Sequence, residues 1–195
     1  LRNKVGMIEI AIEEKKIFLE KKENYNWEKF TNLMKILNYF GCLEDVNITD
    51  IGESIGSLRT ENELWVGLVL LSGYLDDLEP PDLAAVIQSI SVEVRRSDSW
   101  CNFKPSSKVL DVFNELESLK KLLSSQQFNY FIDLPIYLEK DLTGIVSQWA
   151  RGQKWKEIIF NTSLDEGDVV RIIRRTMDVL SQIQYCGSLS SKLKN

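Results

Sequence analysis

Apolar side chains recur every three or four residues along most of the chain, the spacing that places them on one face of an α-helix. Residues 4–22 show this spacing, and a second helix is expected from Asn26 until Gly41 stops it. A short helix should then begin at Thr49 or Asp50. The remaining expected helices cover residues 64–74, 83–92, 107–128 and 155–160, with one more that Asp141 caps and Gly152 ends. A long last helix is expected to follow residues 163–166 and to run to Gln184. No segment alternates apolar and polar residues over the length of a strand, so the pattern predicts an all-α, multi-helix bundle.

Local signals refine some of these helices. Residues 60–63 and 163–166 each match a capping box, in which the side chain of Thr60 or Ser163 accepts a hydrogen bond from a backbone N–H. The helix over 64–74 is apolar on nearly all sides, which predicts a central place in the core. Four tryptophans lie on apolar helical faces and are also expected in the core: Trp27, Trp65, Trp149 and Trp155. Residues 130–137 stay ambiguous because Pro135 interrupts them.

Composition narrows the chemistry that the chain can perform. The 195 residues are 44% hydrophobic and 27% charged, as in globular proteins, and they include no histidine. This excludes histidine-based triads and HExxH zinc sites, and neither a Walker loop nor GxGxxG nor GxSxG is present. Three widely spaced cysteines without a CxxC pair are expected to be buried thiols. We therefore expect no catalytic residue and no metal site in this chain.

The longest uncharged apolar stretch spans residues 64–75, whereas a membrane-spanning helix needs about 20 residues. A buried helix is therefore expected, without a membrane anchor. Because the sequence begins with leucine, we interpret it as a fragment of a longer protein.

Charge is unevenly distributed. The net charge is −5, but residues 44–99 hold three basic and twelve acidic side chains, a net of −9. Residues 151–195 hold eight basic and five acidic side chains, a net of +3. This balance argues against a wholly basic nucleic-acid binder, yet it allows a local positive groove near the C-terminal end.

The last long helix carries the most informative surface. Steps of three and four residues place Asp168, Arg171, Arg175, Asp178 and Gln182 on one stripe, with Arg174 beside it. A second stripe comprises Val169, Ile173, Met177, Leu180 and Gln184. Spacing alone favours a solvated face on which Asp168 and Asp178 neutralise the arginines. The alternative is a face toward a nucleic-acid strand, because arginine forks bind phosphate.

Trp100 is expected in a loop near Arg95, Arg96 and Lys104. There it can stack on a nucleic-acid base or close the edge of the domain, and both interpretations remain open.

Three ordered stretches resemble a known family. They are residues 72–80 followed by 83–86, residues 148–152 with Trp155 and Ile158, and residues 165–171 with Arg174 and Arg175. Their order and spacing resemble the C-terminal DSHCT domain of superkiller-like DExH-box RNA helicases, and within it the branch of cyanobacteria and chloroplasts. The resemblance covers Glu63 to Gln184.

The resemblance implies a division of the chain and a set of RNA contacts. Residues 1–43 would be a charged helical lead-in from the preceding helicase region, and residues 44–195 the DSHCT-like bundle. The family's Glu-Gly-x-x-x-Arg element falls on Glu166, Gly167 and Arg171. Arg175 and Asp178, further along the same helix, would face RNA. One departure is that residues 49–54 are more acidic than the basic Lys-Gly-Arg element common at this point of the family.

The function implied is an accessory domain that contacts single-stranded RNA and braces the motor core of a helicase in RNA processing or decay. The expected partners are this RNA, the helicase core domains of the same polypeptide, and proteins of RNA decay or processing. Because motor motifs are absent, ATP and Mg²⁺ would bind to the core of the parent protein, whose ATP-dependent helicase activity this fragment would not carry. The parent would work inside the cell, in a bacterial cytoplasm or the plastid stroma. The alternative is a helical scaffold that binds proteins and makes no RNA contact.

Overall fold

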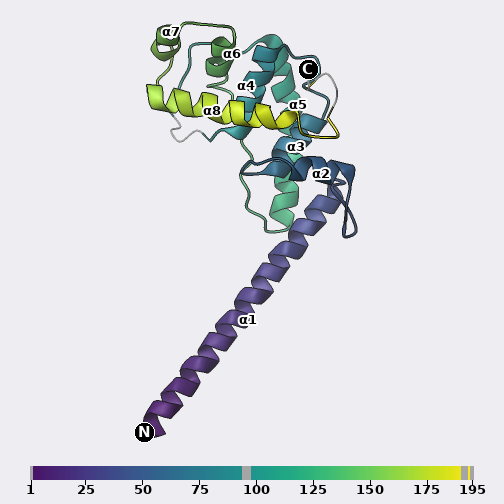
Figure 1. The fold of residues 1–195 in the computed structure, drawn as a ribbon, viewed down its shortest axis with the longest axis vertical. Helices are drawn as coiled ribbons and strands as arrows, with labels where there is room; N and C mark the ends of the chain where they lie inside the picture. The colour runs from purple at the N-terminus through teal and green to yellow at the C-terminus, as the bar shows by residue number, and fades with distance from the viewer. Residues whose placement is uncertain (1, 94–97, 190–192, 194–195) are drawn as a thin grey trace.

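A computed structural model describes residues 2–93, 98–189 and 193. In chain order its elements are α1 (Arg2–Tyr39), β1 (Leu43–Glu44), β2 (Asn47–Ile48), α2 (Asp50–Gly56), α3 (Glu63–Leu71), α4 (Pro80–Ser91), α5 (Ser107–Asn129), α6 (Gly144–Ala150), α7 (Trp155–Phe160) and α8 (Glu166–Ile183). Within the described residues, helices dominate and the strands form one short hairpin (Figure 1). The predicted helical bundle is therefore confirmed. No helix in this part of the chain combines the length and apolar character needed to cross a membrane.

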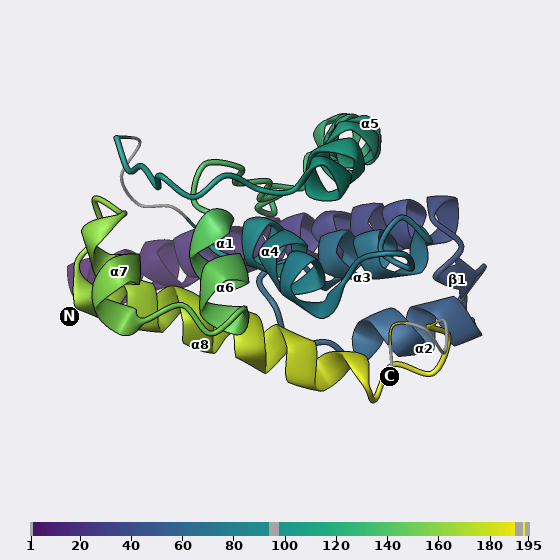
Figure 2. The same ribbon diagram turned by 90° about the horizontal axis from the view of Figure 1, so that it is seen from above.

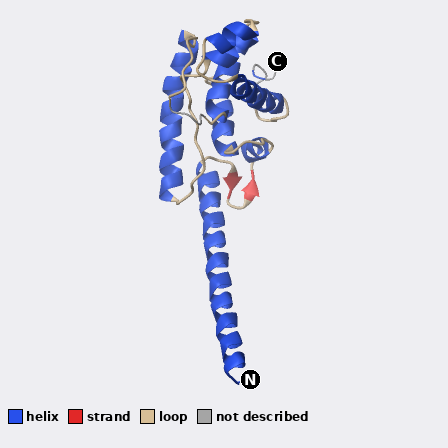
Figure 3. Ribbon diagram, turned by 90° about the vertical axis from the view of Figure 1, so that its left-hand side faces the viewer, coloured by secondary structure: helices blue, strands red, loops and turns tan. Residues whose placement is uncertain are grey.

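The long helix α1 replaces two predicted helices. It runs without a break over 38 residues, because neither glycine nor proline lies between Lys22 and Asn26 to interrupt it. Its first part projects away from the bundle (Figures 1 and 3). Among the side chains of α1 that the structure describes, Leu33 and Ile36 of its last turns pack against the core. The helix ends where Gly41 adopts φ +71°, as its sequence position predicted.

The hairpin between α1 and α2 was not predicted. Leu43 pairs with Ile48 and Glu44 with Asn47 in antiparallel register, and Asp45 adopts φ 56° in the turn. Strands of two residues are too short to show an alternating pattern in the sequence. The hairpin lies where α1 meets the bundle (Figure 3).

Helix α4 forms the centre of the bundle, a place that the sequence pattern had given to the helix over 64–74. Every residue of α4 from Ala84 to Ser91 is buried, whereas Leu64, Leu68 and Leu71 of α3 are partly exposed. Figure 2 shows α4 surrounded by its neighbours, and α4 packs against α3, α5, α6 and α8. Its Val86 belongs to a large apolar cluster with α3 and α5, and its Ala84 to a smaller one with α6, α7 and α8.

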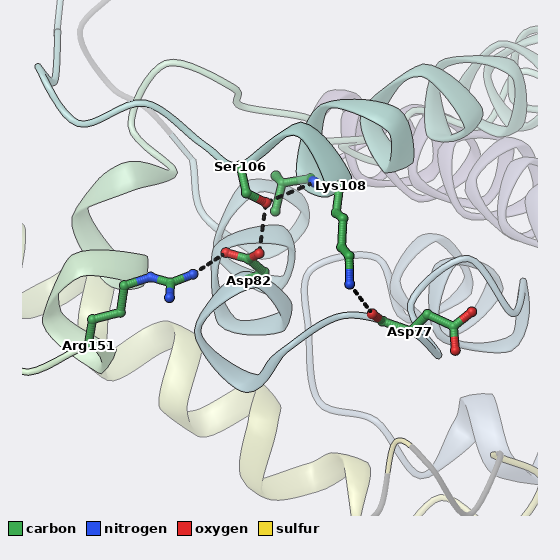
Figure 4. A network of polar contacts seen from close by, with 6 residues as sticks. Asp77, Asp82, Ser106, Lys108 and Arg151 are labelled. Atoms are coloured by element: carbon green, nitrogen blue, oxygen red, sulfur yellow. Dashed lines mark hydrogen bonds and ion pairs between the residues drawn. The ribbon is translucent and has the colours of Figure 1, made fainter.

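A buried carboxylate links three helices (Figure 4). Asp82, in the first turn of α4, accepts a hydrogen bond of 2.7 Å from the hydroxyl of Ser106, the N-cap of α5. Its other oxygen lies 2.8 Å from Nη2 of Arg151, at the end of α6. A contact of 3.4 Å between Lys108 Nζ and the Asp77 carbonyl adds a further link between α5 and the segment before α4. These contacts fix the ends of α4, α5 and α6 relative to one another.

The N-caps of α3 and α8 each lie two residues after the predicted ones. The side chain of Asn62, rather than Thr60, caps α3 by accepting from Trp65 N at 3.1 Å. Asp165, rather than Ser163, caps α8 by accepting from Asp168 N at 2.8 Å. In both boxes a short amide or carboxylate side chain closer to the helix takes the capping role.

The helix expected after Asp141 begins later, at Gly144. A Cβ added to Gly144 would collide with the backbone of Phe103, so this helix starts against that segment and needs glycine there. The helix then ends at Gly152, which adopts φ +83°, as expected.

The tryptophan predictions succeed for some positions and fail for others. Trp65 is 1% exposed in the large cluster, and the partly buried Trp155 packs against the small one. Trp27 is 66% exposed because it lies on the projecting part of α1, and Trp149 is 39% exposed near the end of α6. Both were wrongly expected in the core. The three cysteines are buried free thiols, as expected.

Candidate nucleic-acid interface

Helix α8 buries one face and exposes the other. The buried stripe consists of Val169, Ile172, Ile173, Thr176, Val179 and Ile183. Of the stripe of Val169, Ile173, Met177, Leu180 and Gln184 that the spacing gave, only Val169 and Ile173 are buried, whereas Met177 and Gln184 are exposed. This face packs against α4 and α6, and Val169, Ile172 and Ile173 join the small apolar cluster. Thr176 joins this face because its hydroxyl donates to the Ile172 carbonyl at 2.9 Å.

The three arginines of the predicted RNA-facing stripe differ in exposure. Arg174 is exposed, and among the described residues it forms no ion pair. Arg171 is half-buried, with Nε 3.6 Å from Asp168 Oδ1, as the spacing predicted. This Nε is buried without a hydrogen-bond partner. Arg171 is thus held near a carboxylate at a distance longer than a normal hydrogen bond.

Arg175 pairs with a residue that the sequence did not reveal. Its Nη2 lies 3.8 Å from Glu61 Oε1, at the start of α3, whereas Asp178 had been expected to neutralise it. The other oxygen of Glu61 accepts a 2.6 Å hydrogen bond from the phenol of Tyr137. The hydrogen bond to this carboxylate, together with burial and its negative charge, raises the pKa of Tyr137 to about 12. Glu61 therefore links the segment before α3 to α8 through Arg175 and to the segment around Tyr137.

Gln182 contributes to the fold in this structure. Its Oε1 accepts from Arg59 N at 2.6 Å, and its Nε2 donates to the Asp178 carbonyl at 3.0 Å. Both ends of the amide are thus occupied, which ties the end of α8 to the loop before α3. Asp178 is exposed on the outer face of the helix, as a residue facing a partner would be.

Trp100 is held beside the start of α8. Its backbone N–H donates to Ser163 Oγ at 2.8 Å, and its carbonyl accepts from Ser163 N at 3.1 Å. The neighbouring Cys101 forms a bridge with Thr162. These contacts hold the backbone of Trp100, whose side chain is 47% exposed, against the segment that precedes α8.

Of the basic neighbours predicted for Trp100, Lys104 is exposed, and Arg95 and Arg96 lie outside the described residues. The structure therefore brings Trp100 to the end of α8 that carries the Glu-Gly element, with Arg171, Arg174 and Arg175 further along the helix.

The contact between Glu61 and Tyr137 predicts a measurable titration. Replacing Glu61 with glutamine removes the charge, so the pKa of Tyr137 is expected to fall from about 12 toward its ordinary value of 10. Because the folded pKa is the higher one, this contact stabilises the fold below pH 10, and its contribution is lost as the pH rises through 12. The ultraviolet absorbance titration of Tyr137→Phe is subtracted from that of the unmodified chain. The difference reports the ionisation of the Tyr137 phenol alone.

Glu63→Gln is the matched control, because this carboxylate lies two residues away and the Tyr137 phenol does not bind it. A pKa of Tyr137 that is the same with and without Glu61→Gln would contradict the contact between these two side chains.

Comparison with known proteins identifies the family. The DSHCT (NUC185) domain family matches residues 45–195. The chain is 36% identical over 172 residues to the chloroplastic DExH-box ATP-dependent RNA helicase DExH15 of Arabidopsis thaliana, which covers 85% of this chain and 15% of that relative. It is 26% identical over 157 residues to an uncharacterized helicase of Schizosaccharomyces pombe, covering 77% of the chain and 15% of the relative. It is 24% identical over 155 residues to the probable helicase HelY of Mycobacterium leprae, covering 74% of the chain and 17% of the relative.

The chain spans between 15% and 17% of the length of these three relatives. The family match extends through α8, which carries the Glu-Gly-x-x-x-Arg element. The chain therefore belongs to the DSHCT domain family of DExH-box RNA helicases.

Proposed function

We propose that this chain is an accessory domain that contacts single-stranded RNA through the outer face of α8 and braces the motor core of a DExH-box helicase. The observation that carries the proposal is the arrangement of Arg171, Arg174 and Arg175 on this helix. Arg171 lies 3.6 Å from Asp168 and Arg175 lies 3.8 Å from Glu61, the two carboxylate contacts that these arginines form among the described residues. Such contacts are weaker than a bidentate pair, so the guanidinium groups remain available to phosphate oxygens.

The electrostatics of α8 support weak, sequence-tolerant binding. Arginine forks contact phosphates of any sequence, and the exposed Trp100 offers a surface on which a base can stack. Acidic residues are interleaved with the arginines, among them Glu166, Asp168 and Asp178. We therefore expect few phosphate contacts and a shallow dependence of affinity on salt concentration.

Alanine substitutions of the arginines test the proposal. Each of Arg171→Ala, Arg174→Ala and Arg175→Ala is expected to weaken binding of a fluorescein-labelled oligouridine about three- to tenfold, because each removes one phosphate contact. Fluorescence anisotropy at low salt measures the affinity. The control is Lys121→Ala, an exposed basic residue on α5, which lies across the bundle from α8 (Figure 2). Arginine variants that bind as the unmodified chain does would contradict the proposal.

That contradictory outcome would favour a scaffold that binds proteins. One observation supports this second candidate: Phe128 and Phe131, at the end of α5, are 82% and 87% exposed. Exposed aromatic side chains of this size are typical of protein interfaces.

The parent protein's activity is a further part of the proposal. The Arabidopsis relative is named as an ATP-dependent RNA helicase, and the other two relatives are named as helicases. We infer that ATP and Mg²⁺ act in core domains of a longer polypeptide, with RNA and those core domains as partners of this chain. Proteins of RNA processing or decay are further partners. The chloroplastic name of the plant relative supports the plastid stroma as its location.

A further inference from the structure

A cavity of about 400 Å³ lies where α1 joins the bundle. Its walls come from the last turns of α1, the hairpin, α2, the start of α3 and the segment after α5. The lining is mostly aliphatic and includes Leu33, Leu37, Leu43, Ile48, Ile55 and Leu134. This volume falls within the range of sites that bind small molecules or inserted side chains. The cavity lies apart from the arginines of α8, none of which lines it.

Two glycines of α2 line the cavity. A Cβ at Gly52 would collide with the carbonyl oxygen of Cys42, so α2 lies directly against that backbone. A Cβ at Gly56 would meet no atom within 4 Å, so this wall faces open space. Gly56 is exposed, so the space beside it at the rim of the cavity is not occupied by any described side chain.

The polar groups of the wall are already hydrogen-bonded. Asn62 accepts from Trp65 N at 3.1 Å and donates to Gln127 Oε1 at 3.2 Å. Gln127 in turn donates to the Leu134 carbonyl at 2.8 Å. Because these amides are satisfied within the fold, the interior suits an apolar group better than a polar ligand.

Apolar side chains also remain uncovered on the hairpin beside the cavity. Ile48, which lines it, is 71% exposed, and Val46 in the turn is 74% exposed. Two large aliphatic side chains exposed next to an apolar hollow extend its surface outward. This extension fits an occupant that reaches the cavity from outside.

The charge around the cavity is negative. Residues 43–57 contain Glu44, Asp45, Asp50 and Glu53 and no lysine or arginine. Glu63 lines the cavity, and so does one base, Arg59. The Nη1 of Arg59 donates to the carbonyls of Gly56 and Leu58, which holds this guanidinium against the chain. A negative surface of this kind favours a positively charged partner and opposes RNA.

We propose that this cavity receives a large apolar side chain from a positively charged peptide segment of a separate partner protein. The apolar side chain would fill the hollow beside Gly56 and cover Ile48. The flanking lysines or arginines would lie near Glu63 and the acidic hairpin. This site is independent of the RNA contact proposed for α8, so either proposal can fail without the other.

Labelled peptides test this site on the whole chain. The probe is a short lysine-rich peptide with a central Leu-Phe pair, and two comparison peptides carry Ser-Ser at the centre or glutamates in place of the lysines. We expect the probe to bind at least tenfold tighter than either comparison peptide, as measured by fluorescence anisotropy. Equal affinities, or no binding of the probe, would overturn the proposal.

Two variants locate the binding. Gly56→Leu should fill the hollow and weaken probe binding at least tenfold, with an unchanged or higher Tm because leucine favours a helix over glycine. Ser118→Leu, which adds the same side chain to an exposed position of α5, should bind the probe as the unmodified chain does. Ile48→Ser changes an exposed position and should also weaken probe binding. This variant keeps the test decisive if Gly56→Leu does not fold. Variants at Gly56 and Ile48 that both retain full affinity would place the peptide elsewhere and overturn the proposal.

Discussion

Replacing Trp65 with alanine is expected to lower the free energy of unfolding by about 3–5 kcal/mol. The indole is 1% exposed in the large apolar cluster, and its Nε1 donates to the Tyr137 carbonyl at 2.8 Å. Removal of the side chain leaves a cavity between α3 and its neighbours and also leaves a buried carbonyl without its donor. Urea denaturation followed by circular dichroism measures the change.

Two companion variants separate the contributions at this position. Trp65→Phe keeps most of the apolar volume and loses the hydrogen bond, so a smaller loss of about 1–2 kcal/mol is expected. Trp27→Ala is the matched control, because this tryptophan is 66% exposed on the projecting part of α1. A cost at Trp65 no greater than the cost at Trp27 would contradict the core position of Trp65.

Replacing Arg151 with alanine is expected to cost about 2–3 kcal/mol of the free energy of unfolding. Asp82 is buried in the first turn of α4, and Arg151 is the one described cation that pairs with it. Without the guanidinium, this carboxylate keeps the Ser106 hydroxyl and loses its charge partner (Figure 4). The loss is smaller than for a fully buried pair, because 44% of the Arg151 side chain is already exposed.

A double-mutant comparison isolates this ion pair. Adding Asp82→Asn to Arg151→Ala removes the buried charge, so the double variant should lose less than the sum of the two single variants. Arg174→Ala, at an exposed arginine without a described ion pair, should stay within about 0.5 kcal/mol of the unmodified chain. Strict additivity of the two single variants would show that Asp82 and Arg151 do not stabilise each other.

Helical periodicity predicted most of this fold because helices such as α5 and α8 bury an apolar face. The helix over 155–160 was predicted with the bounds that α7 has, and the one over 107–128 differs from α5 by one residue. The last long helix was predicted to end at Gln184, one residue after α8 ends. The prediction divided α1 into two helices because Asn26 is a favourable N-cap residue, whereas the helix runs through it. The hairpin was missed because its strands hold two residues each.

The candidate site was predictable only in its local part. Spacing along one helix placed Arg171 near Asp168, and the two side chains lie together as expected. The pairing of Arg175 with Glu61 depends on how α8 packs beside the loop before α3, which no local pattern encodes. The position of Trp100 depends in the same way on hydrogen bonds to Ser163, a residue far along the chain.

The projecting helix α1 has a mechanical consequence. At 1.5 Å per residue, its 38 residues extend about 57 Å, and only the turns near Leu33 and Ile36 are fixed to the rest of the molecule. For a rod of this length, a tilt of about 1° at the fixed end displaces the far end by about 1 Å. Small repacking around Ile36 would thus be amplified into large movements at the remote tip, and force applied at that tip would return to the bundle as torque on the same few side chains.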